Sequence, residues 1–126
     1  MTTGNTFAPK KETRYVIVGN GAAGAAALRE IRSTDPAGRI TMLTEEGYDA
    51  YSRPLISYYL KGRVQMNKMG YGSPLPPDGL TEVCLSTRVE GIDPEAHTLQ
   101  LEGGEILPYD KLLLATGSVP FVPPME

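Results

Sequence analysis

A glycine-rich turn, GNGAAG at residues 19–24, constrains the fold more than any other feature of the sequence. It follows the apolar run RYVIV at residues 14–18, which is typical of a strand buried on both faces of a parallel sheet. The alanine- and leucine-rich stretch that comes next predicts a helix over residues 22–33. A second strand is predicted at residues 39–44. A strand, a helix and a strand within about 30 residues predict a right-handed βαβ unit.

Each glycine of this G-x-G-x-x-G pattern has its own steric task in a nucleotide-binding turn. Gly19 permits the tight turn, Gly21 lets the backbone approach a pyrophosphate, and Gly24 lets the helix pack close to the sheet. The N–H groups at the start of the helix, around Ala22 and Ala23, then offer a partial positive charge to the phosphates. The pattern in this setting predicts a dinucleotide site. The plainer interpretation is a small-residue helix that only packs against a sheet.

Two acidic residues follow the second predicted strand. Glu45 lies 21 residues beyond Gly24, where an acid can hydrogen-bond the hydroxyls of an adenosine ribose. Glu46 takes this role instead if the strand ends one residue later, and we prefer Glu45. Because a carboxylate here would repel a 2′-phosphate, the sequence predicts NAD or FAD as the dinucleotide rather than NADP.

The rest of the chain is expected to be mostly loop and β-structure. A short helix is predicted at residues 54–60, since proline suits a first helical turn. A surface loop follows at 70–79, where three prolines and three glycines occur in ten residues. Further strands are predicted at 83–85, 89–92, 98–102, 105–107 and 111–115. The strands between 89 and 107 would form a small meander, and the last would be a buried parallel strand.

Composition excludes several classes of protein. Cys84 is the only cysteine, which rules out a disulfide framework and a cysteine-rich zinc site; we expect it to be buried and inert. His97 is the only histidine and is predicted on the surface at a hairpin turn. We therefore predict no metal site and nominate no catalytic residue. The net charge of −3 disfavours nucleic acid, and no apolar run reaches the about 18 residues of a membrane span. The polar start of the chain predicts a cytoplasmic protein.

Several motifs occur in a fixed order: RYVIVGNGAAG, ITMLTEE, YSRPLIS and KLLLATGSVP. With them, residues 14–124 resemble the N-terminal FAD-binding part of the pyridine nucleotide–disulfide oxidoreductase superfamily. The most similar branch contains NADH–rubredoxin and ferredoxin reductases, NADH oxidases and nitrite reductases. The resemblance implies an α/β fold, a Rossmann-like FAD-binding domain with a parallel sheet and an inserted small antiparallel β-meander. It also implies that FAD is the cofactor.

The resemblance assigns FAD contacts beyond the glycine turn. Arg53 would contact the phosphate and ribose region, and Pro54 would pack near the isoalloxazine ring. Main-chain groups of Val89 would meet the adenine. The terminal motif would lie near the pyrophosphate and consists of Ala115, Thr116 and Gly117.

The chain departs from the family pattern in two respects. No cysteine lies between Glu45 and Leu60, so disulfide reduction is not expected. No second G-x-G-x-x-G occurs, so NAD(P)H would bind through a domain or subunit outside this chain. We expect a disordered tail at 1–13, an incomplete FAD-binding domain at 14–118, and a linker or exit toward a missing NAD(P)H-binding domain at 119–126.

These features are interpreted as the FAD-binding portion of a flavin-dependent NAD(P)H oxidoreductase. Hydride would pass from nicotinamide to FAD and its electrons on to an acceptor. The alternative is a stand-alone NAD-binding or nucleotide-sensing module without enzymatic activity, which the glycine turn and Glu45 would support equally. A half-walled site also predicts exposed apolar surface, and with it a partner subunit or self-association.

Overall fold

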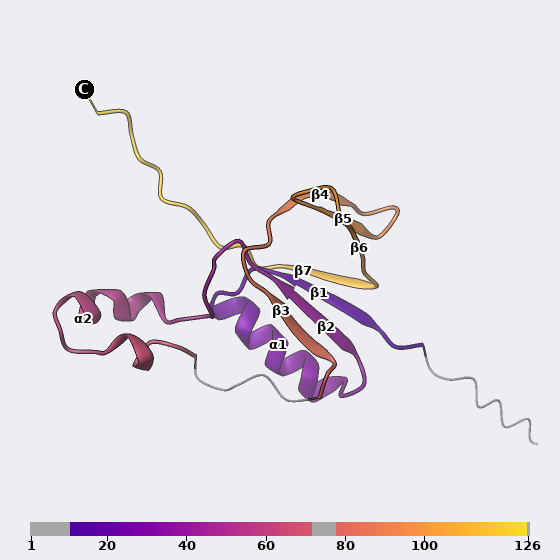
Figure 1. The fold of residues 1–126 in the computed structure, drawn as a ribbon, viewed down its shortest axis with the longest axis horizontal. Helices are drawn as coiled ribbons and strands as arrows, with labels where there is room; N and C mark the ends of the chain where they lie inside the picture. The colour runs from indigo at the N-terminus through magenta and orange to yellow at the C-terminus, as the bar shows by residue number, and fades with distance from the viewer. Residues whose placement is uncertain (1–10, 72–77, 126) are drawn as a thin grey trace, which may run out of the picture.

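A four-stranded parallel sheet forms the centre of the computed structural model, which describes residues 11–71 and 78–125 (Figure 1). Most of the tail predicted at 1–13 and of the loop predicted at 70–79 lies outside the described residues. The strand order is β3-β2-β1-β7, with every neighbouring pair parallel. The strands are β1 (Arg14–Val18), β2 (Arg39–Leu43), β3 (Thr81–Cys84) and β7 (Lys111–Leu114). The predicted α/β Rossmann-like fold is confirmed. The last strand, β7, pairs in parallel as predicted, but it is an edge strand with Leu113 and Leu114 exposed, which corrects the prediction that it is buried.

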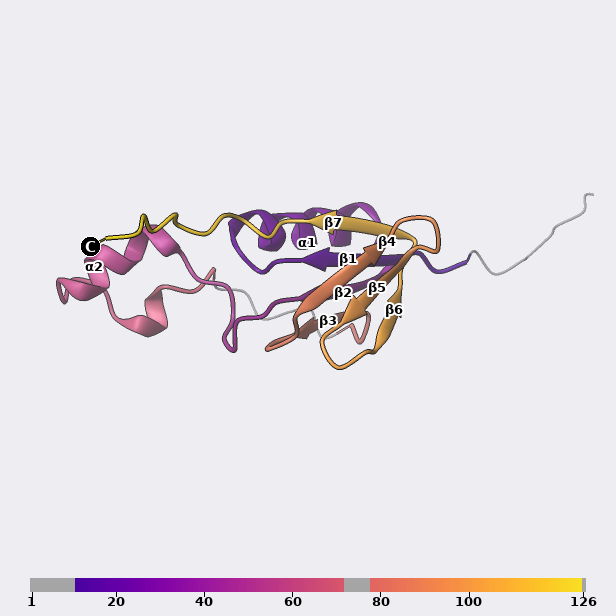
Figure 2. The same ribbon diagram turned by 90° about the horizontal axis from the view of Figure 1, so that it is seen from above.

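The helix α1 (Ala22–Thr34) covers one face of this sheet (Figure 2). Because successive residues of a strand point to opposite faces, Ile17 of β1 faces the helix and Val16 faces away from it. Ile17 is fully buried against Leu28 of α1 and against two residues of β2. This apolar contact packs α1 against β1 and β2.

An antiparallel meander covers the opposite face and links β3 to β7 (Figures 1 and 2). Its strands are β4 (Val89–Asp93), β5 (Thr98–Leu101) and β6 (Ile106–Pro108). Leu99 and Leu101 pack with Val16 of β1, Leu43 of β2 and the ring of Tyr109. The small antiparallel meander predicted within the domain is thereby confirmed.

The segment after β2 projects beyond the sheet (Figure 1). Its short elements are η1 (Arg53–Leu55), α2 (Ile56–Leu60) and η2 (Met66–Lys68). The helix predicted at 54–60 is thus a 3-10 turn followed by one α-helical turn, and neither buries a residue. A β-bridge between Tyr51 and Gly70 closes the base of the segment.

Two predictions of side-chain environment have different outcomes. Cys84 is only partly buried at the end of β3, which corrects the expectation of a buried thiol. Burial, and then the charge of Glu82, raises the pKa of this thiol and disfavours the reactive thiolate. His97 is exposed in the β4–β5 turn as predicted, with φ of 53° and its ring stacked on Tyr109 at 5.4 Å.

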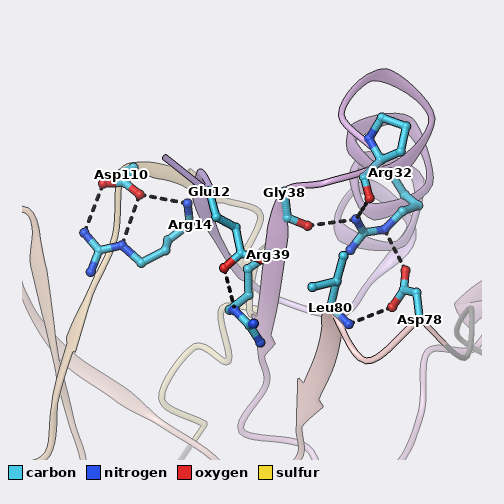
Figure 3. Close-up of polar contacts among 9 residues, drawn as sticks. Glu12, Arg14, Arg32, Gly38, Arg39, Asp78, Leu80 and Asp110 are labelled. Atoms are coloured by element: carbon cyan, nitrogen blue, oxygen red, sulfur yellow. Dashed lines mark hydrogen bonds and ion pairs between the residues drawn. The ribbon is translucent and has the colours of Figure 1, made fainter. Parts of the chain in front are cut away.

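Polar contacts fasten the amino ends of the parallel strands (Figure 3). Nε and Nη2 of Arg14 donate to the two carboxylate oxygens of Asp110, each at 3.0 Å, and the Arg14 main-chain N–H donates at 2.8 Å. Arg32 of α1 donates to the Gly38 carbonyl at 2.7 Å and pairs with Asp78 at 3.1 Å. These contacts lie at the end of the sheet opposite the glycine-rich turn, so they are structural.

Replacing Asp110 by asparagine is expected to lower the urea midpoint of unfolding at pH 7. The hydrogen bond from the Arg14 side chain, and then that from its main chain, hold the pKa of Asp110 well below its usual range. A lowered folded-state pKa gives stability that is complete above the unfolded value of about 3.9 and is lost as pH falls through the folded value. The difference between the wild type and Asp110→Asn should therefore shrink below about pH 4.

The matched control is Glu12→Gln, which removes an exposed ion pair to Arg39 at 3.3 Å. Only a small change is expected there, because exposed single-contact pairs stabilise proteins little. An Asp110→Asn midpoint equal to that of the wild type at pH 7 would contradict the role assigned to the pair.

Candidate functional site

A cavity of about 830 Å³ opens at the carboxyl ends of β1, β2 and β7. Pockets for small molecules commonly measure about 300–1,000 Å³, and open α/β sheets bind ligands at this edge. Eleven of the thirteen predicted site residues line the cavity. These eleven are Gly19, Gly21, Ala22, Ala23, Glu45, Glu46, Arg53, Val89, Ala115, Thr116 and Gly117.

The exceptions are Gly24 and Pro54. Gly24 is buried under the turn, where it serves packing. Pro54 is exposed and is the second residue of the 3-10 turn η1, directly after Arg53. Its predicted place near a flavin ring stays a prediction.

The three glycines of the turn differ in what surrounds them. Gly19 has φ of 111°, and a side chain there would overlap the carbonyl of Ala115. A side chain at Gly24 would overlap the carbonyl of Gly19. At Gly21, by contrast, an added Cβ would meet nothing within 4 Å. The fold requires the first and third glycines, whereas the second leaves open room on the cavity wall.

The N-terminus of α1 contributes unused hydrogen-bond donors to the same wall. Gly21 is the N-cap residue, no side chain caps the helix, and the first turn holds no acidic residue. The Ala25 N–H already donates to the Gly21 carbonyl at 2.9 Å, so the free donors are the main-chain N–H groups that precede Ala25 at the start of α1. The 13-residue helix adds a partial positive charge at this end. This wall of the cavity suits an anion.

The loop after β2 is held against the loop after β3. The Thr44 N–H donates to the Cys84 carbonyl at 3.0 Å, and the Thr87 N–H donates to the Thr44 carbonyl at 2.8 Å. The Ser86 N–H donates to the Glu46 carbonyl at 3.0 Å. These bonds place two acidic side chains and the stretch 87–89 around one end of the cavity.

Arg53 lies at the edge of the cavity and is paired with Glu46. Its Nη2 donates to Glu46 Oε1 at 2.8 Å, and its guanidinium carbon lies 5.4 Å from the centre of the Tyr51 ring. The hydrogen bond and then the charge of Glu46 raise the pKa of Arg53, which is always protonated in any case. Arg53 is therefore a cation at the cavity edge whose position is already fixed by one carboxylate.

Several lining residues were not predicted from the sequence. They are Val18, Asn20, Leu43, Thr44, Thr87, Arg88, Ser118 and Val119. Most of them lie one or two positions in sequence from a predicted residue. The motifs therefore predicted the region of the cavity but not every residue that lines it. Arg88 and Glu45 also line a shallower hollow of about 520 Å³ that adjoins the cavity.

Neither metal ligation nor membrane insertion has support among the described residues. Within 11–71 and 78–125, no three histidine, cysteine, aspartate or glutamate side chains cluster as metal ligands would. In the same ranges, no helix has the length and apolar character needed to cross a bilayer.

Comparison with protein families shows one match over almost the whole chain. The family model described as pyridine nucleotide-disulphide oxidoreductase matches residues 13–126. The nitrite reductase [NAD(P)H] large subunit of Klebsiella oxytoca is 38% identical over 113 residues, which are 87% of this chain and 12% of the relative. Rubredoxin-NAD(+) reductase of Acinetobacter baylyi is 34% identical over 110 residues, 83% of this chain and 28% of the relative.

Solved structures are similar over the same region. The water-forming NADH oxidase from Lactobacillus brevis bound to NADH superposes with a TM-score of 0.80 at 27% identity, covering 90% of this chain and 27% of that one. NADH:rubredoxin oxidoreductase from Clostridium acetobutylicum gives 0.75 at 26% identity, covering 90% and 30%. The chain thus spans less than a third of the length of each of these relatives.

Proposed function

Because the chain belongs to the pyridine nucleotide-disulphide oxidoreductase family, we propose that it forms the FAD-binding portion of a flavin-dependent NAD(P)H oxidoreductase. Enzymes of this family are FAD-dependent pyridine nucleotide oxidoreductases. Bound FAD would supply the redox chemistry, in which a hydride taken from a reduced nicotinamide would be passed on as electrons to an acceptor. NAD(P)H and that acceptor would be bound by parts of the protein outside this chain.

The open space at Gly21 is the observation that carries the proposal. The fold does not need a glycine there, since a side chain would meet nothing within 4 Å. The glycine borders the cavity beside the uncapped N-terminus of α1. A missing side chain next to free N–H donors is what the close approach of a pyrophosphate requires. The residues therefore fit the central part of FAD.

We assign the other walls of the cavity to the ribose, the adenine and the phosphates of FAD. We assign the ribose hydroxyls to the carboxylate of Glu45, which is exposed and faces the cavity from the end of β2. Val89 would contact the adenine through its main chain. Thr116 and Gly117, at the end of β7, and Arg53 would lie along the phosphates. The chain's contribution is to bind and orient FAD, and it offers no side chain that we assign to proton transfer. Location in the cytoplasm stays a prediction.

The first experiment is the visible absorption spectrum of the purified chain, incubated with and without FAD and then desalted. Retained flavin bands are the expected result. Binding of NAD by a chain that retains no flavin would instead support a stand-alone NAD-binding module. A chain that binds neither FAD nor NAD would overturn the proposal.

Replacing Glu45 by alanine is expected to weaken FAD binding by about 1–3 kcal/mol, because two ribose hydroxyls would lose their acceptor. The affinity is measured by titration calorimetry. Glu90→Ala is the matched control, since Glu90 is also an exposed glutamate, on β4, but does not line the cavity. Equal affinities of Glu45→Ala and the wild type would remove the ribose contact from Glu45.

A further inference from the structure

Two adjacent acidic residues at the cavity have different surroundings. Glu45 is exposed and forms no ion pair within the described part of the chain. Glu46 is half-buried, with its side chain 26% exposed, and its carboxylate pairs with Arg53 at 2.8 Å. Its main chain is fixed on both sides: its N–H donates to Thr44 Oγ1 at 3.2 Å, and its carbonyl accepts from Ser86. Glu46 therefore presents its carboxylate from an anchored backbone.

The guanidinium of Arg53 keeps most of its donors unused. It has five N–H groups, of which Glu46 Oε1 accepts one. Residues 11–71 and 78–125 offer it no other hydrogen-bond acceptor, and its side chain is 63% exposed at the edge of the cavity. The Tyr51 ring lies against the guanidinium at 5.4 Å and restricts it from a second side. The free donors are thus available to an anion in the cavity.

We propose that Glu46, supported by Tyr51, is the positioning residue for Arg53 and does not contact the ribose. It holds the guanidinium at the cavity edge, where the remaining donors bind the pyrophosphate. A long arginine side chain loses rotamer freedom when it binds a ligand, and one that is already held loses less. This assignment rests on the proposed dinucleotide site and names a role within it.

Whether removal of the Glu46 carboxylate weakens or strengthens anion binding distinguishes a positioning role from a purely electrostatic one. A carboxylate that merely lies near a phosphate repels it, so its removal would strengthen anion binding. A carboxylate that positions the phosphate-binding arginine does the opposite, and its removal weakens binding. The weakening should also disappear when Arg53 is absent, because Glu46 acts only through Arg53.

The test is a double-mutant cycle with ADP as the ligand, measured by titration calorimetry. ADP contains the adenine, the ribose and the pyrophosphate but no flavin. Glu46→Gln is expected to weaken ADP binding roughly fivefold, the upper end of what an exposed charge pair contributes. Arg53→Gln should weaken it at least as much. The double variant should bind no more weakly than Arg53→Gln alone.

Two further variants and a stability measurement serve as controls. Glu45→Gln should weaken ADP binding equally with and without Arg53, since Glu45 is assigned a contact of its own. Glu95→Gln removes one negative charge in the β4–β5 turn, outside the cavity, and should change nothing. The urea midpoint of each variant shows whether a change in binding follows from a change in folding.

The outcomes distinguish this inference from the proposed function. The positioning role is overturned if Glu46→Gln tightens ADP binding, leaves it unchanged, or weakens it equally in the absence of Arg53. Binding of ADP with the expected cycle but no binding of FAD would support the positioning role and overturn the FAD proposal. If FAD binds but the effects of Glu46→Gln and Arg53→Gln on ADP affinity simply add, the FAD proposal is supported and the positioning role is overturned. A wild-type chain that binds neither FAD nor ADP would overturn both.

Discussion

Replacing Gly21 by valine is expected to reduce the affinity for FAD and ADP by roughly a hundredfold while the chain remains folded. The added side chain would occupy the space beside the N-terminus of α1 where the pyrophosphate approaches. Forcing extra carbon atoms into a filled contact costs about 1–3 kcal/mol, and a hundredfold loss lies at the upper end of this range. The backbone itself is compatible with valine, since Gly21 has φ of −90° and ψ of −163°.

Titration calorimetry measures the loss, and circular dichroism with urea unfolding measures the fold. Gly91→Val is the matched control, because Gly91 lies on β4 outside the cavity and its Cβ would make only ordinary contacts with Gln100 at 3.6 Å. That variant should bind as the wild type does. Gly21→Ala should give a smaller loss than Gly21→Val. Wild-type affinity in Gly21→Val would contradict the placement of a pyrophosphate at this turn.

The fold was predictable because its information is local. The apolar run before Gly19, the helix-forming run after it and the alternation in the meander each specify one element within a few residues. The parallel pairing of β1 with β2 then follows from the order of strand, helix and strand. The start of β3 shows the limit of this method. Thr81 and Glu82 look too polar for a buried strand, yet they pair with β2. Their polar side chains are tolerated because β3 lies at the edge of the sheet.

The site was predictable as a region but not as a set of contacts. The glycine turn and the acid mark the carboxyl edge of a parallel sheet, and the structure brings both to one cavity. The pair between Glu46 and Arg53 could not be foreseen, because it depends on how the loop after β2 folds back on itself. The place of Arg88 likewise depends on hydrogen bonds between two loops that are 40 or more residues apart in sequence.

Replacing Gly24 by alanine is expected to lower the free energy of unfolding by roughly 3 kcal/mol, the upper end of the cost of overpacking. In an ordinary helix the same change would stabilise the protein by about 1 kcal/mol, since alanine is the better helix former. Here the new methyl group would overlap the carbonyl of Gly19, and a backbone atom cannot move aside as a flexible side chain can. The sign of the change therefore reports how closely α1 approaches the turn.

Urea unfolding followed by circular dichroism gives this free energy, and Gly21→Ala is the control, because its methyl group would meet nothing within 4 Å. That control should lose at most about 1 kcal/mol, the usual cost of alanine at an N-cap. Equal or greater stability of Gly24→Ala would show that α1 can move away from β1. If the expected loss is found, binding should fall with it, because α1 carries the N–H donors of Ala22 and Ala23 that border the cavity. Gly24→Ala would thus impair folding and binding together, whereas Gly21→Val would impair binding with no more than the small stability cost of a poor N-cap residue. This contrast separates the glycine that the fold needs from the glycine that the ligand needs.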